Sequence, residues 1–155
     1  MRLALYQPDI PQNTGTILRL AACLDVPCDI IAPAGFDMSD RALRRAGLDY
    51  LGHVKISRHE SFDAFEAERA RRGERLVLMT TSAEMPYCGF TFRASDCLLL
   101  GRESSGVPEA VHEAADARLL IPMSNNMRSI NVAMSAAMVL GEALRQTGHF
   151  AKHPA

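Results

Sequence analysis

Residues 97–108 read CLLLGRESSGVP, an apolar run that changes abruptly into a polar stretch with two glycines and ends on a proline. The apolar run predicts a buried strand, and Pro108 predicts the start of a helix, because proline suits the first helical position. A buried strand followed by a loop and a helix is typical of parallel α/β sheets. The polar loop between them offers backbone N–H groups to a ligand.

Short apolar strands alternate with helical spacing along the rest of the chain. Further strands are predicted at 2–6, 28–32, 54–56, 76–81 and 118–122, and further helices at 12–25, 39–47, 61–73 and 130–147. This alternation predicts an α/β fold with an open, mostly parallel sheet of about five or six strands and helices on both faces. We expect a single domain over residues 1–155, in which residues 149–155 form a flexible tail.

Composition limits the function classes. Seventeen basic and 18 acidic side chains give a formal charge of -1, which excludes a strongly cationic nucleic-acid binder and leaves such contacts to a local patch. Residues 41–75 carry nine basic and six acidic side chains, a charge of +3, so this segment is the favoured contact for a polyanion. Within it, Arg69, Arg71, Arg72 and Arg75 form either phosphate contacts or a solvated helix end.

The sequence also predicts a cytoplasmic protein without a membrane or metal partner. No apolar run reaches the roughly 18 to 20 residues that span a bilayer. The cysteines Cys23, Cys28, Cys88 and Cys97 form no C-x-x-C pair, and we expect them to be small buried hydrophobic residues.

Two further segments combine a strand end, a polar loop and a helix start. They are PQNTGTILR at 11–19, where Asn13 is expected to cap the helix, and IPMSNNMRSIN at 121–131, where Ser129 is expected to do so. An ordinary capped helix would explain either segment alone. None of the loops matches a P-loop or a Gly-x-Gly-x-x-Gly dinucleotide fingerprint. The alanines and methionines of 133–138 suit close packing against another element or another subunit.

Taken together, the three segments resemble the three motifs of the SPOUT RNA methyltransferases in order and spacing. These motifs are Pro-x-Asn-x-Gly-x3-Arg at 11–19, Leu-Gly-x-Glu-x2-Gly-x-Pro at 100–108 and Ile-Pro-Met-x4-Arg-Ser-x-Asn at 121–131. With RRAGLDY at 44–50 and EALRQ at 142–146, the chain is most similar to the bacterial tRNA wobble-nucleotide (cytidine/uridine-2'-O-)-methyltransferases. It departs from the expected pattern at Gly141, where we expect many relatives to carry a tyrosine.

The resemblance implies a fold and an activity that composition and periodicity do not reveal. It implies a C-terminal trefoil knot, a homodimer, S-adenosylmethionine as cofactor, and methylation of a ribose 2'-hydroxyl at the wobble nucleotide of the tRNA anticodon loop, with leucine tRNAs as the expected substrates. By position, the resemblance places Met79, Gly101, Ile121 and Ser129 at the cofactor, with Glu103 and Ile130 nearby. It places Asn13, Arg44 and Arg45 at the tRNA and makes Arg19 the catalytic residue.

The role of Arg19 stays open at this point, because an arginine, with a pKa above roughly 12, is a poor general base. It either removes the proton of the 2'-hydroxyl, or orients the hydroxyl and a phosphate and stabilises developing charge. Two alternative functions also remain: a 2'-O-methyltransferase of another tRNA or rRNA position, and a non-enzymatic RNA-binding module of the same fold.

Overall fold

The computed structural model describes residues 1–45, 51–125 and 127–150. Within these residues a seven-stranded sheet has the order β3-β2-β1-β6-β4-β7-β5, and every neighbouring pair is parallel. The strands are β1 (Arg2–Tyr6), β2 (Cys28–Ile31), β3 (Ile56–His59), β4 (Arg75–Met79), β5 (Met85–Pro86), β6 (Asp96–Leu100) and β7 (Ala117–Leu120). The predicted α/β class with a parallel sheet is therefore confirmed.

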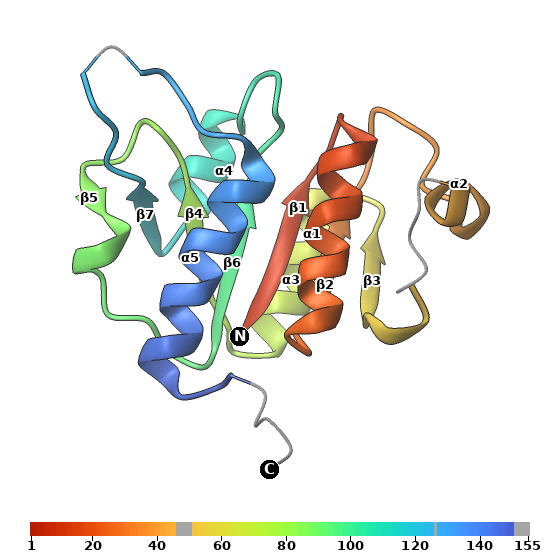
Figure 1. Ribbon diagram of the computed structural model, residues 1–155, viewed down its shortest axis with the longest axis horizontal. Coiled ribbons are helices and arrows are strands. Elements are labelled where there is room, and N and C mark those ends of the chain that lie inside the picture. Colours follow the sequence, from red (N-terminus) through yellow and green to blue (C-terminus); the bar gives the residue numbers. More distant parts are fainter. Residues whose placement is uncertain (46–50, 126, 151–155) are drawn as a thin grey trace.

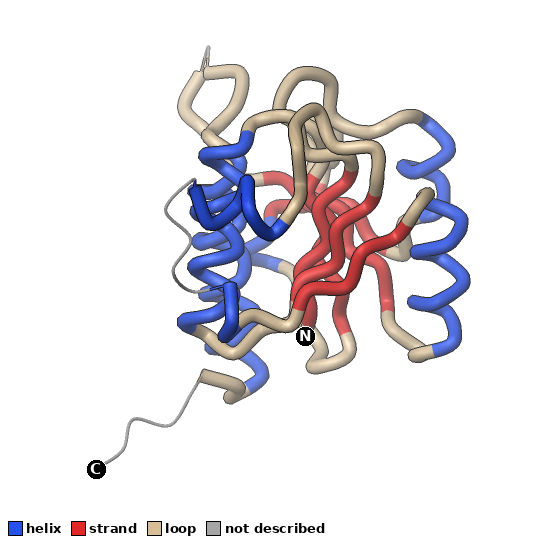
Figure 2. Tube along the Cα trace, turned by 90° about the vertical axis from the view of Figure 1, so that its right-hand side faces the viewer, coloured by secondary structure: helices blue, strands red, loops and turns tan. Residues whose placement is uncertain are grey.

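Helices cover both faces of this sheet, as predicted. Figure 1 shows α1 and α5 in front of the strands with α3 and α4 behind, and Figure 2 shows the two helical layers on either side of the sheet. The α-helices are α1 (Pro11–Cys23), α2 (Asp40–Arg45), α3 (Phe62–Arg71), α4 (Glu109–Ala114) and α5 (Val132–Thr147), with 3-10 turns η1 (Leu51–His53) and η2 (Tyr87–Gly89). No described helix is long and apolar enough to cross a membrane.

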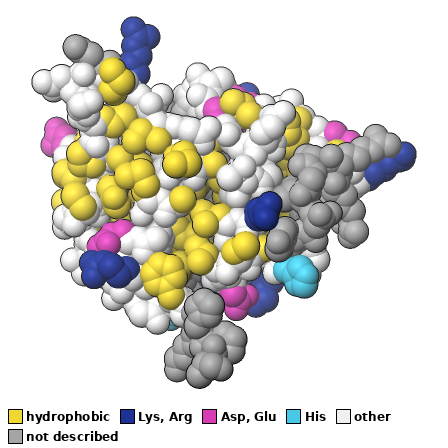
Figure 3. Space-filling view, in the orientation of Figure 1, with side chains coloured by type: hydrophobic (Ala, Val, Ile, Leu, Met, Phe, Trp, Pro, Cys, Tyr) yellow, Lys and Arg dark blue, Asp and Glu magenta, His cyan; other side chains and the backbone are white. Residues whose placement is uncertain are grey.

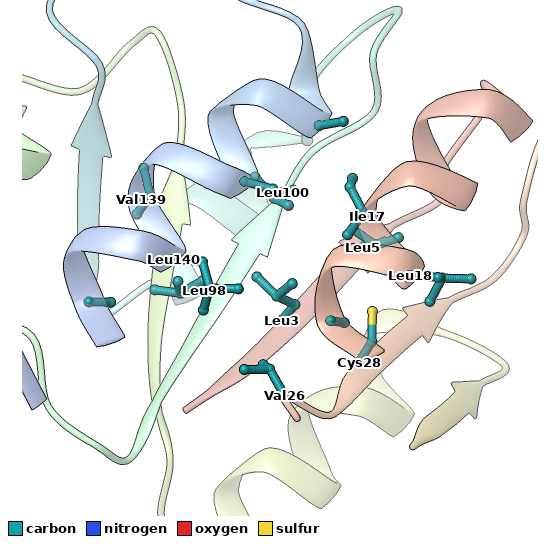
Figure 4. Packing of buried hydrophobic residues seen from close by; sticks show 14 of the residues in the cluster. Leu3, Leu5, Ile17, Leu18, Val26, Cys28, Leu98, Leu100, Val139 and Leu140 are labelled. Carbon is teal, nitrogen blue, oxygen red and sulfur yellow. The ribbon is translucent and has the colours of Figure 1, made fainter. Parts of the chain in front are cut away.

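The core has two layers because successive residues of a strand point to opposite faces of a sheet. On the face of α1 and α5, strand residues pack against helix residues, and Figure 4 labels Leu3, Leu5, Leu98 and Leu100 from the strands with Ile17, Leu18, Val139 and Leu140 from the helices. On the other face, Ala4 and Leu99 pack with Phe65 of α3 and Val111 of α4. The two central strands β1 and β6 are thus covered on both sides and hold the loops that follow them in fixed positions.

Several local predictions need correction. The strand expected at 54–56 forms at Ile56–His59, and β5 was not predicted because an edge strand of two residues carries no periodic signal. Cys28 and Cys97 are buried as expected, but Cys23 and Cys88 are exposed, since they lie at the end of α1 and in η2 rather than in strands. The knot and the single-domain assignment stay predictions.

Candidate functional site

A pocket of about 380 Å³ opens at the carboxyl ends of the central strands. Four separate segments line it: the start of α1, the end of β4, the loop after β6, and the stretch from the end of β7 to α5. Ligands bind at this edge of open α/β sheets. The pocket brings together residues that sequence reasoning singled out, namely Asn13, Met79, Gly101, Glu103, Ile121, Ser129 and Ile130.

The loop after β6 forms one wall of the pocket and is shaped by two glycines. Arg102 and Gly106 exchange backbone hydrogen bonds of 3.0 and 2.9 Å, which closes the loop into a tight turn. Gly106 has a φ of +67°, a conformation that favours glycine. A Cβ at Gly101 would lie 2.9 Å from the carbonyl carbon of Gly106, so only glycine fits there without a shift of backbone. The sequence therefore needs both glycines to build this wall.

Glu103 connects this loop to the segment before α1. Its Oε1 accepts a hydrogen bond from Nδ2 of Asn13 at 3.2 Å, and its Oε2 accepts one from the backbone N–H of Asp9 at 3.2 Å. In return, the backbone N–H of Glu103 donates to Oδ1 of Asp9 at 3.1 Å. The Ser104 hydroxyl also donates to Asp9. Two loops that are about 90 residues apart in sequence are therefore held face to face.

Neither α1 nor α5 is capped by the residue that the sequence suggested. Asn13 does not cap α1, which begins at Pro11 after Ile10, a residue that makes no side-chain cap. The cap of α5 is Asn131 rather than Ser129: its Oδ1 accepts hydrogen bonds from the backbone N–H groups of Ala133 and Met134 at 2.8 and 3.3 Å. Proline at the helix start removes one orphan donor. The Asn13 amide instead donates to Glu103 and accepts from Asn131.

Asp9 and Glu103 form a pair of neighbouring carboxyl groups with opposite pKa shifts. Burial raises the pKa of Glu103, and its hydrogen bond with Asp9 raises it further. The pKa of Asp9 is lowered, first by the hydrogen bond from Glu103 and then by that from Ser104. The hydrogen bonds that Asp9 accepts therefore stabilise its negative charge, while burial disfavours the charged form of Glu103.

The predicted catalytic residue lies outside the pocket of its own chain. Arg19 is exposed on α1, and it is not among the residues that line the pocket. It follows Asn13 by six residues, which corresponds to about 9 Å along a helix axis. Arg44 and Arg45 are the last residues of α2, and their side chains lie outside the described part of the structure.

The basic cluster between Arg69 and Arg75 is engaged within the chain. Each arginine forms an ion pair with a carboxylate at 2.6 to 2.8 Å: Arg69 with Glu66, Arg71 with Glu68, Arg72 with Glu74, and Arg75 with Asp96. Forked contacts of this kind use the same donors that would bind phosphate. The structure therefore favours the interpretation of this cluster as a helix end held by ion pairs within the chain, rather than as a phosphate-binding site.

Sequence reasoning missed Asp9, Arg102 and Ser135. Arg102 and Ser135 line the pocket. Asp9 does not line it, but its side chain accepts a hydrogen bond from the backbone N–H of Glu103, which does. Asp9 follows the carboxyl end of β1, and that position was the available signal. Its partner Glu103 could not be identified from sequence, because the pairing depends on how β1 and β6 lie side by side in the sheet.

An apolar surface lies next to the pocket. Figure 3 shows hydrophobic side chains gathered on the side of the molecule that carries α5. Met134 and Met138 project from this helix with 59% and 39% of their surface exposed, and Ala137 between them is exposed as well. Ile130, also exposed, lines the pocket, so the surface and the pocket are continuous. We call the exposed residues Met134, Ala137 and Met138 the α5 face.

Known proteins resemble this chain over almost its whole length. A model of the SpoU rRNA methylase family matches residues 1–141. The tRNA (cytidine(34)-2'-O)-methyltransferase of Beijerinckia indica subsp. indica is 65% identical over 150 residues, which cover 97% of this chain and 94% of the relative. A solved structure that concerns 2-OH methylation of C/U34 on tRNA has a TM-score of 0.87 and 43% identity, and 94% of each chain is covered.

A more distant solved structure contains the cofactor. The SpoU methyltransferase AviRb from Streptomyces viridochromogenes, in complex with AdoMet, has a TM-score of 0.81 and 27% identity, and the match covers 94% of this chain and 60% of AviRb. The family model spans most of the chain, and the relative from Beijerinckia is nearly the same length. The resemblance inferred from the three motifs is confirmed, and the chain belongs to the SpoU rRNA methylase family.

Proposed function

We propose that this chain transfers a methyl group from S-adenosylmethionine to the ribose 2'-hydroxyl of nucleotide 34, the wobble nucleotide, of tRNA. The observation that carries the proposal is the convergence of three distant segments on one pocket, joined by hydrogen bonds from Asn13 to Glu103 and from Asn131 to Asn13. The high identity to a relative named for this reaction supports the choice of tRNA and of position 34.

The pocket fits the proposed cofactor in size and lining. Its volume falls in the range of small-molecule sites, and its walls combine apolar side chains such as Leu100 and Val107 with the backbone of the glycine loop. The close approach of Gly101 to Gly106 leaves backbone rather than side chain at this wall. We propose that Met79, Gly101, Ile121 and Ser129 hold the cofactor, which supplies a methyl group on a positively charged sulfur.

The chain's own part in this reaction is to align the 2'-hydroxyl and to manage one proton. Alignment needs rigid groups, and Asn13 is fixed on two sides, by Glu103 and by Asn131. Arg19 is the proposed catalytic residue. As a permanent cation it orients the hydroxyl and a substrate phosphate or stabilises developing charge; as a base it would first need to lose a proton, which its high pKa opposes.

We also propose a homodimer built on the α5 face and α1. Exposed apolar side chains on a helix favour burial against another subunit, and α1 lies beside α5 on the same side of the sheet. Arg19 does not line the pocket of its own chain. In the proposed dimer, it would instead lie at the pocket of the second subunit. Each active site would then combine one subunit's pocket with the other subunit's arginine.

For the tRNA, we propose that Arg44 and Arg45 hold backbone phosphates of the anticodon stem-loop. The substrate nucleotide is cytidine or a modified uridine at position 34, and leucine tRNAs are the proposed isoacceptors. Phosphate contacts position an RNA without reading its sequence, so the choice among tRNAs rests on bases near position 34.

Methyl transfer to defined tRNAs tests the function. Purified protein, radiolabelled S-adenosylmethionine and an unmodified leucine tRNA transcript should give labelled tRNA, and nuclease mapping should place the label at nucleotide 34. A transcript that carries 2'-deoxyribose at nucleotide 34 is the matched control and should stay unlabelled. Label at another position, or label only in rRNA, would overturn the choice of nucleotide.

Cofactor binding separates the enzyme from the RNA-binding alternative. Calorimetry with S-adenosylmethionine should show saturable binding to the folded protein in the absence of RNA. A folded protein that binds tRNA but gives no heat at millimolar cofactor would instead support the non-enzymatic module.

A further inference from the structure

Asp9 lies outside the pocket, yet it contacts the pocket loop at four points. Its Oδ1 accepts from the backbone N–H of Glu103, its other carboxylate oxygen accepts from the Ser104 hydroxyl, and its own backbone N–H donates to Oε2 of Glu103. Nε of Arg102 is 3.6 Å from its Oδ2. The Asp9 side chain is only 13% exposed, so water is largely kept from these contacts.

We propose that Asp9 is a positioning residue for methyl transfer, which holds Glu103 in the one orientation that fixes the Asn13 amide at the pocket. This inference rests on the proposed function for its effect on turnover, but the contacts on which it depends exist in the free protein. Asp9 does not line the pocket, so it is proposed to act through Glu103.

The order of donors and acceptors explains how Asp9 acts over a distance. Glu103 presents an acceptor oxygen to Asn13, so Nδ2 of Asn13 must face Glu103 and its Oδ1 must face Asn131. If Glu103 turned away, either end of the Asn13 amide could face the pocket. Asp9 prevents this turn, because reciprocal hydrogen bonds join its backbone and side chain to those of Glu103.

Charge supports the same arrangement. Hydrogen bonding with Glu103 and Ser104 lowers the pKa of Asp9 and so stabilises its negative charge, while burial raises the pKa of Glu103. The negative charge is placed where the Ser104 hydroxyl and the Arg102 guanidinium meet it.

Substitution of the neighbouring Gly35 offers a second way to change the position of Asp9. The backbone N–H of Gly35, in the loop after β2, donates to the carbonyl of Pro8 at 2.9 Å. A Cβ on Gly35 would lie 2.9 Å from Cβ and 3.0 Å from Cα of Asp9. Gly35→Ala is therefore expected to displace Asp9 without removing any polar side chain of the network.

The experiment compares Asp9→Ala, Asp9→Asn and Gly35→Ala with wild type. Asp63→Ala is the control for the aspartate variants, because Asp63 is exposed on α3 on the opposite face of the sheet. Gly89→Ala is the control for the glycine variant, because a Cβ there meets nothing within 4 Å. For each protein, kcat and KM for tRNA are measured, together with the NMR signal of the Asn13 side-chain amide and the titration of Glu103 without RNA.

Asp9→Ala and Gly35→Ala should lower kcat by about 10- to 100-fold, with KM for tRNA changed far less, because position rather than affinity is lost. The Asn13 amide signal should shift in both. Asp9→Asn keeps the acceptor for the Glu103 N–H, so it should restore most of the turnover. It should still lower the pKa of Glu103, because the neighbouring charge is gone.

Three outcomes would overturn the proposal: wild-type kcat in Asp9→Ala, an Asn13 amide signal unchanged in both disruptive variants, or an Asp9→Asn protein as inactive as Asp9→Ala at equal folding stability. If Asp9→Ala does not fold, Gly35→Ala and Asp9→Asn still decide. If wild type does not methylate nucleotide 34, the proposed function fails, while the amide signal and the Glu103 titration continue to test the positioning by Asp9.

Discussion

Asn131 donates from Nδ2 to Oδ1 of Asn13 at 2.9 Å, although 118 residues separate them. With its Oδ1, the same amide accepts from two backbone N–H groups at the start of α5. An asparagine is needed for both tasks, since aspartate offers no donor and serine is too short to reach in both directions. This hydrogen bond thereby couples the position of α5 to Asn13, the residue of α1 that lines the pocket.

Replacement of Asn131 should separate its two tasks. Asn131→Ala removes the cap and the bond to Asn13, so the free energy of unfolding should fall by about 1 kcal/mol and kcat should fall as well. Asn131→Asp keeps the capping oxygen at a helix N-terminus, which favours negative charge, and should restore stability. It cannot donate to Asn13, so its kcat should stay low. Urea unfolding and methyl-transfer kinetics measure the two effects.

The aspartate variant is the one that discriminates. If Asn131→Asp regained both stability and wild-type kcat, the bond to Asn13 would have no part in turnover, and Asn131 would be a cap only.

Gly101→Ala should destroy the wall of the pocket. The new Cβ would lie 2.9 Å from the carbonyl carbon and 3.0 Å from Cα of Gly106, and both are backbone atoms that cannot rotate away. Overpacking typically costs about 1 to 3 kcal/mol, so we expect the affinity for S-adenosylmethionine to fall by about 5- to 150-fold. Calorimetry measures the affinity, and Gly89→Ala serves as the control with open space around its Cβ. Wild-type affinity in Gly101→Ala would mean that this loop does not hold the cofactor.

Gly141→Ala should stabilise the folded chain. Gly141 lies inside α5, and a Cβ there meets nothing within 4 Å. Glycine in a helix interior costs about 1 kcal/mol relative to alanine, so the free energy of unfolding should rise by a similar amount. Urea unfolding at low protein concentration tests this. A loss of stability would instead show that a second subunit approaches the backbone closely at Gly141.

Sequence alone predicted the elements of this fold because their signals are local. The apolar run of β6, the start of α4 after Pro108 and the start of α3 after Ser61 each follow from a few neighbouring residues. Met79, Gly101, Ile121 and Ser129 were placed together through motif resemblance, and the structure does bring them to one pocket. Strand order was not predicted, since hydrogen bonds between distant strands leave no periodic trace.

The failures concern pairings that only the folded chain creates. Asn13 and Ser129 are residue types that often cap helices, and both lie near a helix start. However, α1 begins at Pro11 without a side-chain cap, and α5 is capped by Asn131. The sequence left phosphate binding by the arginines from Arg69 to Arg75 as an alternative. In the structure, these arginines form ion pairs with nearby carboxylates instead. In each case the residue type was known from the sequence, but the residue with which it forms its hydrogen bonds or ion pairs was not.

Arg19→Ala should abolish methyl transfer and leave the affinity for S-adenosylmethionine nearly unchanged. Arg19 does not line the pocket of its own chain, so its loss should not disturb the cofactor. Removal of a group that stabilises transition-state charge typically lowers kcat by about 100- to 1,000-fold. Arg71→Ala is the control, since Arg71 is exposed on α3 and pairs with Glu68. Light scattering of both variants should give twice the 17.0 kDa of one chain.

Arg19→Lys then distinguishes the two roles of this residue. Lysine keeps a positive charge without the planar fork, and its pKa is lower than that of arginine. If Arg19 orients the hydroxyl and a phosphate, the lysine variant should regain part of the turnover with an unchanged pH profile. If Arg19 is the base, turnover of the lysine variant should rise steeply with pH as its amine loses a proton. Substantial turnover in Arg19→Ala at saturating tRNA would exclude both roles. The next candidates would then be Asn13, Glu103 and Asn131, which all line the pocket.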